Sequence, residues 1–182
     1  MLIDAHRSLL LVLDVQEKLL PAIHDHQRVI ANVAWLIRAA RKFDIPVAAT
    51  EQYPKGLGRT AAAVRALLPE GAIATKNHFS CVAAQCLPGL PGADRPQIVI
   101  AGVEAHVCVL QTALELVEEG KEVYVAADCV GSRREADCEL ALARMRQEGV
   151  RIVSREMVVF EWLGEAGTPL FKEVSKEFLK DA

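Results

Sequence analysis

The sequence predicts an α/β protein in which helices cover both faces of a parallel β-sheet. Short aliphatic runs alternate along the chain with longer amphipathic segments, as in repeated strand–helix units. The runs are almost continuously apolar, which is typical of strands that are buried on both faces. The 182 residues fit one domain, residues 1–182, and a composition of 52% hydrophobic but only 5% aromatic residues predicts an aliphatic core.

Six apolar runs are the candidate strands. The first run is short and is stopped by Asp14, so it is predicted to be a buried strand rather than the apolar part of a secretory signal. In chain order the candidates are Leu9–Leu13, Pro46–Thr50, Ala72–Thr75, Gln97–Ala101, Glu122–Ala126 and Val150–Ser154.

Two of the predicted helices are indicated by apolar periodicity. Apolar residues recur at helical spacing from Val29 to Ala40. A second pattern runs from Val107 to Glu119 and is followed by Gly120, a residue type that favours the position just past a helix end.

Two further helices are indicated by capping residues. Ser132 with Glu135 three residues later predicts a capping box, and this helix ends before Gly149. Thr168 and Pro169 predict the cap and first turn of a terminal helix.

Charge and composition exclude several classes of partner. The formal net charge is -3 and there is no run of Lys or Arg, so we expect no nucleic-acid partner. No stretch approaches the ~20 apolar residues of a membrane helix, so we expect no membrane partner. The Gly-rich nucleotide-binding motifs do not occur, so we expect no cofactor.

The cysteines and histidines suggest neither disulfides nor a metal. The five cysteines are odd in number and form no C-x-x-C pair, which indicates reduced thiols in the cytoplasm. His24 and His26 are two residues apart, so they do not share a helical face and are expected in a solvated loop.

Three residues with chemical potential fall at or beyond strand ends. Asp14 follows the first apolar run, Lys76 follows the third, and Cys108 lies beyond the fourth, where a helix begins. Each has an ordinary explanation alone, because charged residues often end strands and cysteine often packs as a small apolar residue. Sites in open α/β sheets form at the carboxyl ends of strands, so we expect the three to meet at one edge.

The three residue types suit nucleophilic catalysis. A helix N-terminus and a nearby lysine favour a thiolate, so Cys108 is predicted to be activated. Asp14 can take the thiol proton and return it to a leaving amine, while Lys76 keeps Asp14 ionised. Backbone N–H groups before the helix can stabilise a developing oxyanion.

The segments around these residues resemble the signatures of isochorismatase-like cysteine hydrolases. They read Leu-Asp-Val-Gln at 13–16, Thr-Lys-x-x-Phe-Ser at 75–80 and Gly-Val-Glu-Ala-His-Val-Cys at 102–108. The tract Glu-Gln-Tyr-Pro-Lys-Gly-Leu-Gly at 51–58 resembles the isochorismatase domain-containing branch. The order and spacing of these segments together make the resemblance specific.

The resemblance implies a three-layer αβα fold whose six-stranded parallel sheet has the order 3-2-1-4-5-6. It implies a catalytic triad of Asp14, Lys76 and Cys108 and a cis peptide bond between Val103 and Glu104. It also implies that the backbone N–H groups of Glu104 and Cys108 form an oxyanion hole. Where related nicotinamidases carry an Asp-x-His metal motif, this chain reads Glu-Gln-Tyr at 51–53, so no metal site is expected.

These observations predict a hydrolase that cleaves an amide-type C–N bond of a small molecule through a thioester on Cys108. Two alternatives stay open: a vinyl-ether hydrolase in which Asp14 is the general acid, and a catalytically weak family member acting as an interaction protein. Apolar helix faces and the resemblance predict a homo-oligomer. The candidates for the substrate pocket are Gln52, Tyr53, Phe79 and His106.

Overall fold

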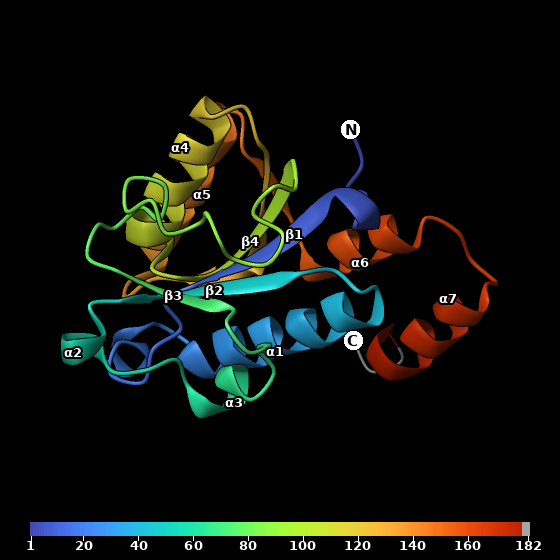
Figure 1. Ribbon diagram of the computed structural model, residues 1–182, viewed down its shortest axis with the longest axis horizontal. Helices are drawn as coiled ribbons and strands as arrows, with labels where there is room; N and C mark the ends of the chain where they lie inside the picture. The colour runs from blue at the N-terminus through green and yellow to red at the C-terminus, as the bar shows by residue number, and fades with distance from the viewer. Residues whose placement is uncertain (180–182) are drawn as a thin grey trace.

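The computed structural model describes residues 1–179 and has a six-stranded, all-parallel sheet at its centre (Figure 1). The strand order is β3-β2-β1-β4-β5-β6, which confirms the predicted order 3-2-1-4-5-6. The strands are β1 (Ser8–Leu13), β2 (Val47–Gln52), β3 (Ile73–Lys76), β4 (Gln97–Val103), β5 (Glu122–Gly131) and β6 (Arg151–Val153).

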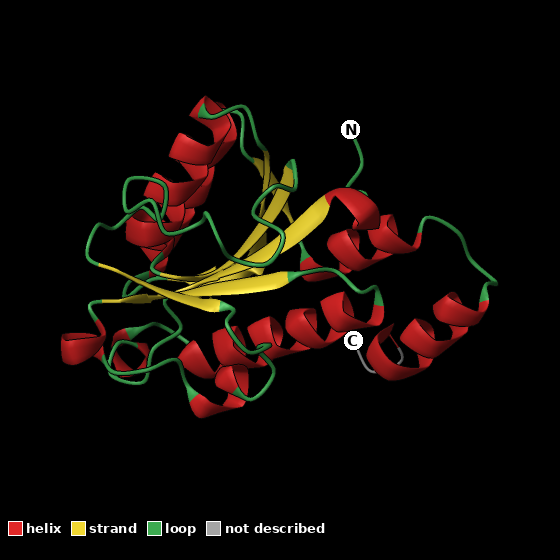
Figure 2. Cartoon of the chain, in the orientation of Figure 1, coloured by secondary structure: helices red, strands yellow, loops and turns green. Residues whose placement is uncertain are grey.

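Helices cover both faces of this sheet (Figure 2), so the predicted three-layer fold is confirmed. Alternate residues of β1 show why the runs are continuously apolar: Leu10 and Val12 pack on one face, whereas Leu9 and Leu11 pack on the other. One face carries α1 (His26–Lys42), α3 (Ala62–Arg65), α6 (Arg155–Leu163) and α7 (Pro169–Val174), and the other carries α4 (Leu110–Glu118) and α5 (Glu135–Gln147).

The terminal elements pack back onto α1. The Thr168 hydroxyl caps α7 by accepting a hydrogen bond of 3.0 Å from the N–H of Phe171, as the sequence predicts. A π-helical turn, Ser175–Leu179, follows α7 and places Phe178 edge-on against Trp35 of α1, with ring centroids 5.3 Å apart. Within residues 1–179 no helix has the length and apolarity to cross a membrane.

One helix prediction and one predicted strand end need correction. The capping box of Ser132 and Glu135 is wrong, because β5 continues to Gly131 and the N-cap of α5 is Arg134, which makes no side-chain cap. The Ser132 hydroxyl instead hydrogen-bonds Nδ1 of His106 at 2.9 Å. Helix α6 is not predicted by the sequence patterns: Ser154, expected at the end of the last strand, is its N-cap and accepts from an N–H in its first turn.

The end of β4 pairs with the end of β1 in a backbone conformation that leaves no room for a side chain. The register between β4 and β5 shifts between Ile100 and Gly102, which lets β5 run on beyond the predicted Ala126. Gly102 has φ +118°, and a Cβ there would lie 2.1 Å from the carbonyl oxygen of Leu13. Only glycine therefore permits this approach, and it brings the segment that carries Cys108 against the segment that carries Asp14.

The short helix α2 (Pro54–Leu57) extends from the end of β2. The 3₁₀ turns Ala5–Arg7 and Leu20–Ala22 flank β1, and the π-helical turn Ala105–Val109 joins β4 to α4. The predicted helix from Val107 to Glu119 is thus divided into this turn and α4, and Gly120 follows in the left-handed region with φ +81°.

Candidate active site

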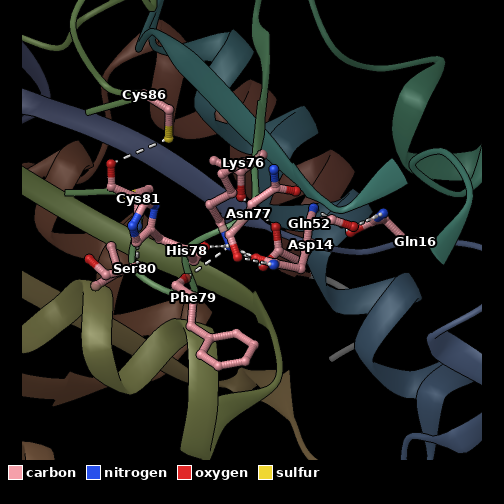
Figure 3. A network of polar contacts seen from close by, with 12 residues as sticks. Asp14, Gln16, Gln52, Lys76, Asn77, His78, Phe79, Ser80, Cys81 and Cys86 are labelled. Carbon is pink, nitrogen blue, oxygen red and sulfur yellow. Dashed lines mark hydrogen bonds and ion pairs between the residues drawn. The ribbon is translucent and has the colours of Figure 1, made fainter. Parts of the chain in front are cut away.

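Asp14 and Lys76 form an ion pair in the interior, at the carboxyl edge of the sheet (Figure 3). Asp14 directly follows β1 with φ 54°, and Lys76 is the last residue of β3, one residue beyond the predicted strand end. Nζ of Lys76 lies 2.7 Å from Oδ2 of Asp14, and both side chains are fully buried. Two strands separated by β2 thus supply opposite charges to one point.

Other polar groups complete the coordination of this pair. The Thr50 hydroxyl donates to Oδ1 of Asp14 at 2.7 Å. Nζ of Lys76 donates to Oε1 of Gln52 at 2.6 Å and to the carbonyl oxygen of Phe79 at 2.9 Å. A buried charge is tolerated when it is paired and hydrogen-bonded, and both charges meet that requirement here.

Gln16 holds the segment that orients Lys76. Its Nε2 donates to the carbonyl oxygens of Gln52 at 2.9 Å and Gly58 at 2.8 Å, while its Oε1 accepts from the N–H of Gln52 at 2.8 Å. The side chain of Gln52 then bridges Lys76 and the carbonyl oxygen of Asn77, to which its Nε2 donates at 2.8 Å. A chain of hydrogen bonds therefore runs from Gln16 through Gln52 to Lys76 (Figure 3).

Cys108 lies beside this ion pair in the π-helical turn between β4 and α4. Its thiol lies near enough to Asp14 and Lys76 for both charges to act on its pKa, and the residue is only 5% exposed. Burial, followed by the negative charge of Asp14, raises the pKa of the Cys108 thiol to about 12, although Lys76 acts in the opposite direction. Burial and Asp14 therefore oppose the thiolate form, which Lys76 and the helix N-terminus are expected from the sequence to favour.

This pKa predicts how Cys108 reacts with alkylating reagents. Its alkylation rate by iodoacetamide is expected to rise about tenfold per pH unit from pH 7 to pH 10 without a plateau, because only the thiolate reacts. Quantitative peptide mapping against pH measures this profile, and denatured protein provides the unperturbed reference. A plateau below pH 8 at Cys108 in the folded protein would contradict the structure.

The peptide bond between Val103 and Glu104 is cis. The carboxylate of Glu104 points to Arg133, whose backbone N–H and Nε donate to Oε2 at 3.1 and 3.0 Å. The carbonyl oxygen of Glu104 accepts from the N–H groups of Val107 and Val109, at 3.1 and 3.2 Å. Neither of these two bonds uses the N–H of Cys108, which lies between Val107 and Val109 in the sequence.

The four predicted pocket residues have different environments, and one of them, His106, is half-buried with its Nδ1 hydrogen-bonded to Ser132. Tyr53 is 54% exposed and lines, with Lys76 and the Asn77–His78 segment, an open pocket of about 450 Å³. Phe79 is 51% exposed. Gln52 is buried and its amide is committed to Lys76 and Asn77, so it supports the ion pair. Over residues 1–179 no group of three or more His, Cys, Asp or Glu side chains is arranged to hold a metal.

Sequence comparison connects this geometry to a known family. Residues 8–157 match the family described as Isochorismatase domain. Isochorismatase domain-containing protein 2 of Danio rerio is 40% identical over 172 residues, which cover 93% of this chain and 85% of that protein. The chain belongs to the isochorismatase family.

Solved structures of similar fold carry different activities in their names. The MAR1 ribonuclease of Caenorhabditis elegans superposes on this isochorismatase-family protein with a TM-score of 0.89 and 36% identity, covering 100% of this chain and 94% of that one. The YcaC product of Escherichia coli is described as an octameric hydrolase of unknown specificity. It superposes with a TM-score of 0.85 and 25% identity, covering 91% of this chain and 83% of that one. Membership of this family supports a hydrolase.

The residues that support the ion pair in this family member are not evident from the sequence. Thr50 and Gln16 are uncharged, and each has an ordinary place at or near a strand end, so neither suggests a role. The one feature of the sequence that points to such a role is the polar run Thr50-Glu51-Gln52 at the end of an apolar strand. All three residues are buried in the structure. Glu51 has a separate structural role, because its Oε1 accepts from the N–H of Thr60 at 2.7 Å.

Replacing Gln16 by leucine is expected to lower the free energy of unfolding by about 2–4 kcal/mol, since it leaves the buried carbonyl oxygen and N–H of Gln52 and the partly buried carbonyl oxygen of Gly58 without their partner. Urea denaturation monitored by circular dichroism measures the change. The exposed Gln147 of α5 provides the matched control, and Gln147→Leu is expected to stay within about 0.5 kcal/mol. Equal effects of the two substitutions would show that the Gln16 amide does not hold this edge.

Proposed function

We propose that this protein is a cysteine-dependent hydrolase that cleaves an amide-type C–N bond of a small molecule through a thioester on Cys108. The observation that carries the proposal is the fully buried Asp14–Lys76 ion pair, 2.7 Å long, whose two charges act on a nearly buried thiol. An ion pair in the interior is costly to maintain for stability alone, and perturbed titratable groups cluster at functional sites.

Asp14 is the general base of the first half-reaction. It takes the proton from Cys108 while the sulfur attacks the amide carbon, so a free thiolate need not accumulate despite the raised pKa. The carbonyl oxygen becomes an oxyanion, for which the backbone N–H groups of Glu104 and Cys108 are the proposed donors. When the C–N bond breaks, Asp14 returns the proton to the leaving amine, and the acyl group remains on sulfur as a thioester.

Water completes the cycle. Asp14, again ionised, takes a proton from the attacking water, and the acid leaves when the C–S bond breaks and Cys108 recovers the proton. Lys76 has an electrostatic role throughout, because its buried positive charge stabilises the carboxylate form of Asp14 and lowers the cost of forming the thiolate.

The environment of the site favours small substrates. Cys108 is only 5% exposed, so a bulky chain would not reach the sulfur without rearrangement. The exposed aromatic rings of Tyr53 and Phe79 are the proposed apolar contacts for the substrate, on the segments that follow β2 and β3. We therefore assign a compact amide as the substrate class.

The amide proposal is tested by trapping the acyl-enzyme. The full chain is incubated with a panel of small aliphatic and aromatic primary amides, and ammonia release is measured. Hydroxylamine is added to convert a thioester into a hydroxamate, and mass spectrometry locates any acyl adduct. We expect ammonia, hydroxamate and an adduct at Cys108 with the same amide; amide turnover with neither hydroxamate nor adduct would rule out the thioester.

Isochorismate and single-stranded RNA belong in the same panel. Isochorismate tests vinyl-ether cleavage with Asp14 as general acid, and RNA tests the activity named for the C. elegans neighbour. Turnover of either one, with no amide hydrolysed, would replace the amide proposal. The net charge of -3 favours the amide over the RNA, because polyanion binding is driven by basic patches.

We also propose that the protein is a homo-oligomer in the cytoplasm. Leu140, Met157 and Phe160 are exposed apolar side chains, and the E. coli neighbour is described as octameric. All five cysteines lie in the described part of the chain and are unpaired, which suits a reducing compartment. Light scattering after gel filtration determines the mass in solution.

A further inference from the structure

Two cysteines outside the proposed catalytic set lie together in the turn that follows β3. The N–H of Cys86 donates to the carbonyl oxygen of Cys81 at 3.2 Å, and the Cys86 thiol donates to the same oxygen at 3.4 Å. The two thiols are near enough for each to shift the pKa of the other. Two cysteines held together in one turn in this way need little movement to reach disulfide geometry.

The two thiols differ in access. Cys81 is fully buried and packs in the apolar cluster under α4, whereas Cys86 is half-buried. Residues 80–86 contain no regular helix or strand, so a small rearrangement of this turn breaks no strand pairing. The N–H of Cys81 is anchored to the Thr112 hydroxyl at 3.1 Å, so Cys86 is the member that can move.

The two thiols also differ in chemistry. Contact with the Cys81 thiol, supported by the charge of Lys76, lowers the pKa of Cys86, whereas contact with Cys86, together with burial, raises the pKa of Cys81. Burial raises the pKa of the other three cysteines, Cys108, Cys129 and Cys138. Thiolate character and access determine which cysteine reacts with an oxidant, and both favour Cys86.

We propose that Cys86 and Cys81 are a peroxide-reactive pair in which Cys86 is the attacking thiol and Cys81 resolves it into a reversible disulfide. The Cys86 thiolate attacks one peroxide oxygen, the O–O bond breaks, and the leaving oxygen takes up the proton that the thiol had released and departs as water or an alcohol, so that Cys86 becomes a sulfenic acid. The Cys81 sulfur then attacks the Cys86 sulfur, the S–O bond breaks, and water leaves with the Cys81 proton. Two thiols thus supply the two electrons that reduce the peroxide, and a thiol reductant restores them.

This proposal does not depend on the amide hydrolase activity. The pair follows Phe79, whose carbonyl oxygen holds Lys76, so the disulfide would form next to the proposed site without a bond to any of its three residues (Figure 3). Success or failure of the test below therefore leaves the proposed hydrolysis unaffected.

The test uses the reduced full chain and limiting hydrogen peroxide. After oxidation the remaining thiols are blocked with N-ethylmaleimide, and intact mass with peptide fragmentation locates the change. We expect a product that has lost two hydrogen atoms, with the bond between Cys81 and Cys86, and full reversal by dithiothreitol. Cys138→Ser is the matched control, because Cys138 is also half-buried but has a raised pKa, and it should oxidise like the wild type.

Two variants separate the roles of the pair. Cys86→Ser is expected to lower the rate of peroxide consumption at least about tenfold and to prevent the disulfide. Cys81→Ser is expected to leave a sulfenic acid at Cys86 that dimedone captures. First oxidation at Cys108, Cys129 or Cys138, or no faster loss of peroxide in the wild type than in Cys86→Ser, would overturn the proposal.

Discussion

Replacing Cys108 by alanine is expected to lower amide turnover by at least about 10⁴-fold, because the variant has no atom that can form the thioester. The fold should persist, since the substitution removes one sulfur atom from a site that keeps its Asp14–Lys76 ion pair. Ammonia release under saturating amide measures the loss, and circular dichroism measures the fold. Cys138→Ala, on α5 and away from the ion pair, is the control and should retain full turnover.

The same variant separates the amide and vinyl-ether alternatives. Alanine at position 108 leaves Asp14 and Lys76 in place, so general-acid cleavage of a vinyl ether would continue. If Cys108→Ala hydrolyses isochorismate at the wild-type rate, Cys108 is a bystander and Asp14 carries the chemistry. Retention of amide turnover by this variant would refute the thioester mechanism directly.

Replacing Lys76 by methionine is expected to lower the free energy of unfolding by about 3–5 kcal/mol at neutral pH, because it leaves the carboxylate of Asp14 buried without its counter-charge. Chemical denaturation measures the loss. Lys172→Met, at an exposed position of α7, is the control and should change stability by no more than about 0.5 kcal/mol.

The pH dependence of the free energy of unfolding of Lys76→Met identifies the cause of its lost stability. Protonation removes the uncompensated charge that this variant leaves in the interior, so acid should restore part of the lost stability. The deficit relative to wild type should therefore be smaller at pH 4 than at pH 8.

The double variant Asp14→Asn/Lys76→Met provides a comparison in which both charges are absent. It removes both charges, so it should be more stable than Lys76→Met alone, because no uncompensated charge stays in the interior. A double variant whose loss equals the sum of the two single losses would show that the two side chains act independently. That result would contradict a functional ion pair at this edge.

The predictable part of the fold lies in local patterns. The apolar runs were sufficient to locate all six strands, because burial on both faces leaves few polar positions in a strand such as β1. The cap at Thr168 was also predictable, since its bond to Phe171 spans only three residues. By contrast, α6 was not predictable because its sequence, Arg-Glu-Met-Val-Val-Phe-Glu-Trp-Leu, has apolar residues on several sides and shows no single apolar stripe.

The sequence alone also determined that Asp14, Lys76 and Cys108 reach one edge of the sheet, because parallel strands end on the same side. Only the tertiary structure decided how they interact. Lys76 and Asp14 are 62 residues apart, and the Gln16–Gln52 hydrogen bonds that support them join residues 36 apart. The protonation of Cys108 was decided in the same way: its pKa depends on how completely distant segments exclude water from the thiol, and no local pattern of residues encodes that exclusion.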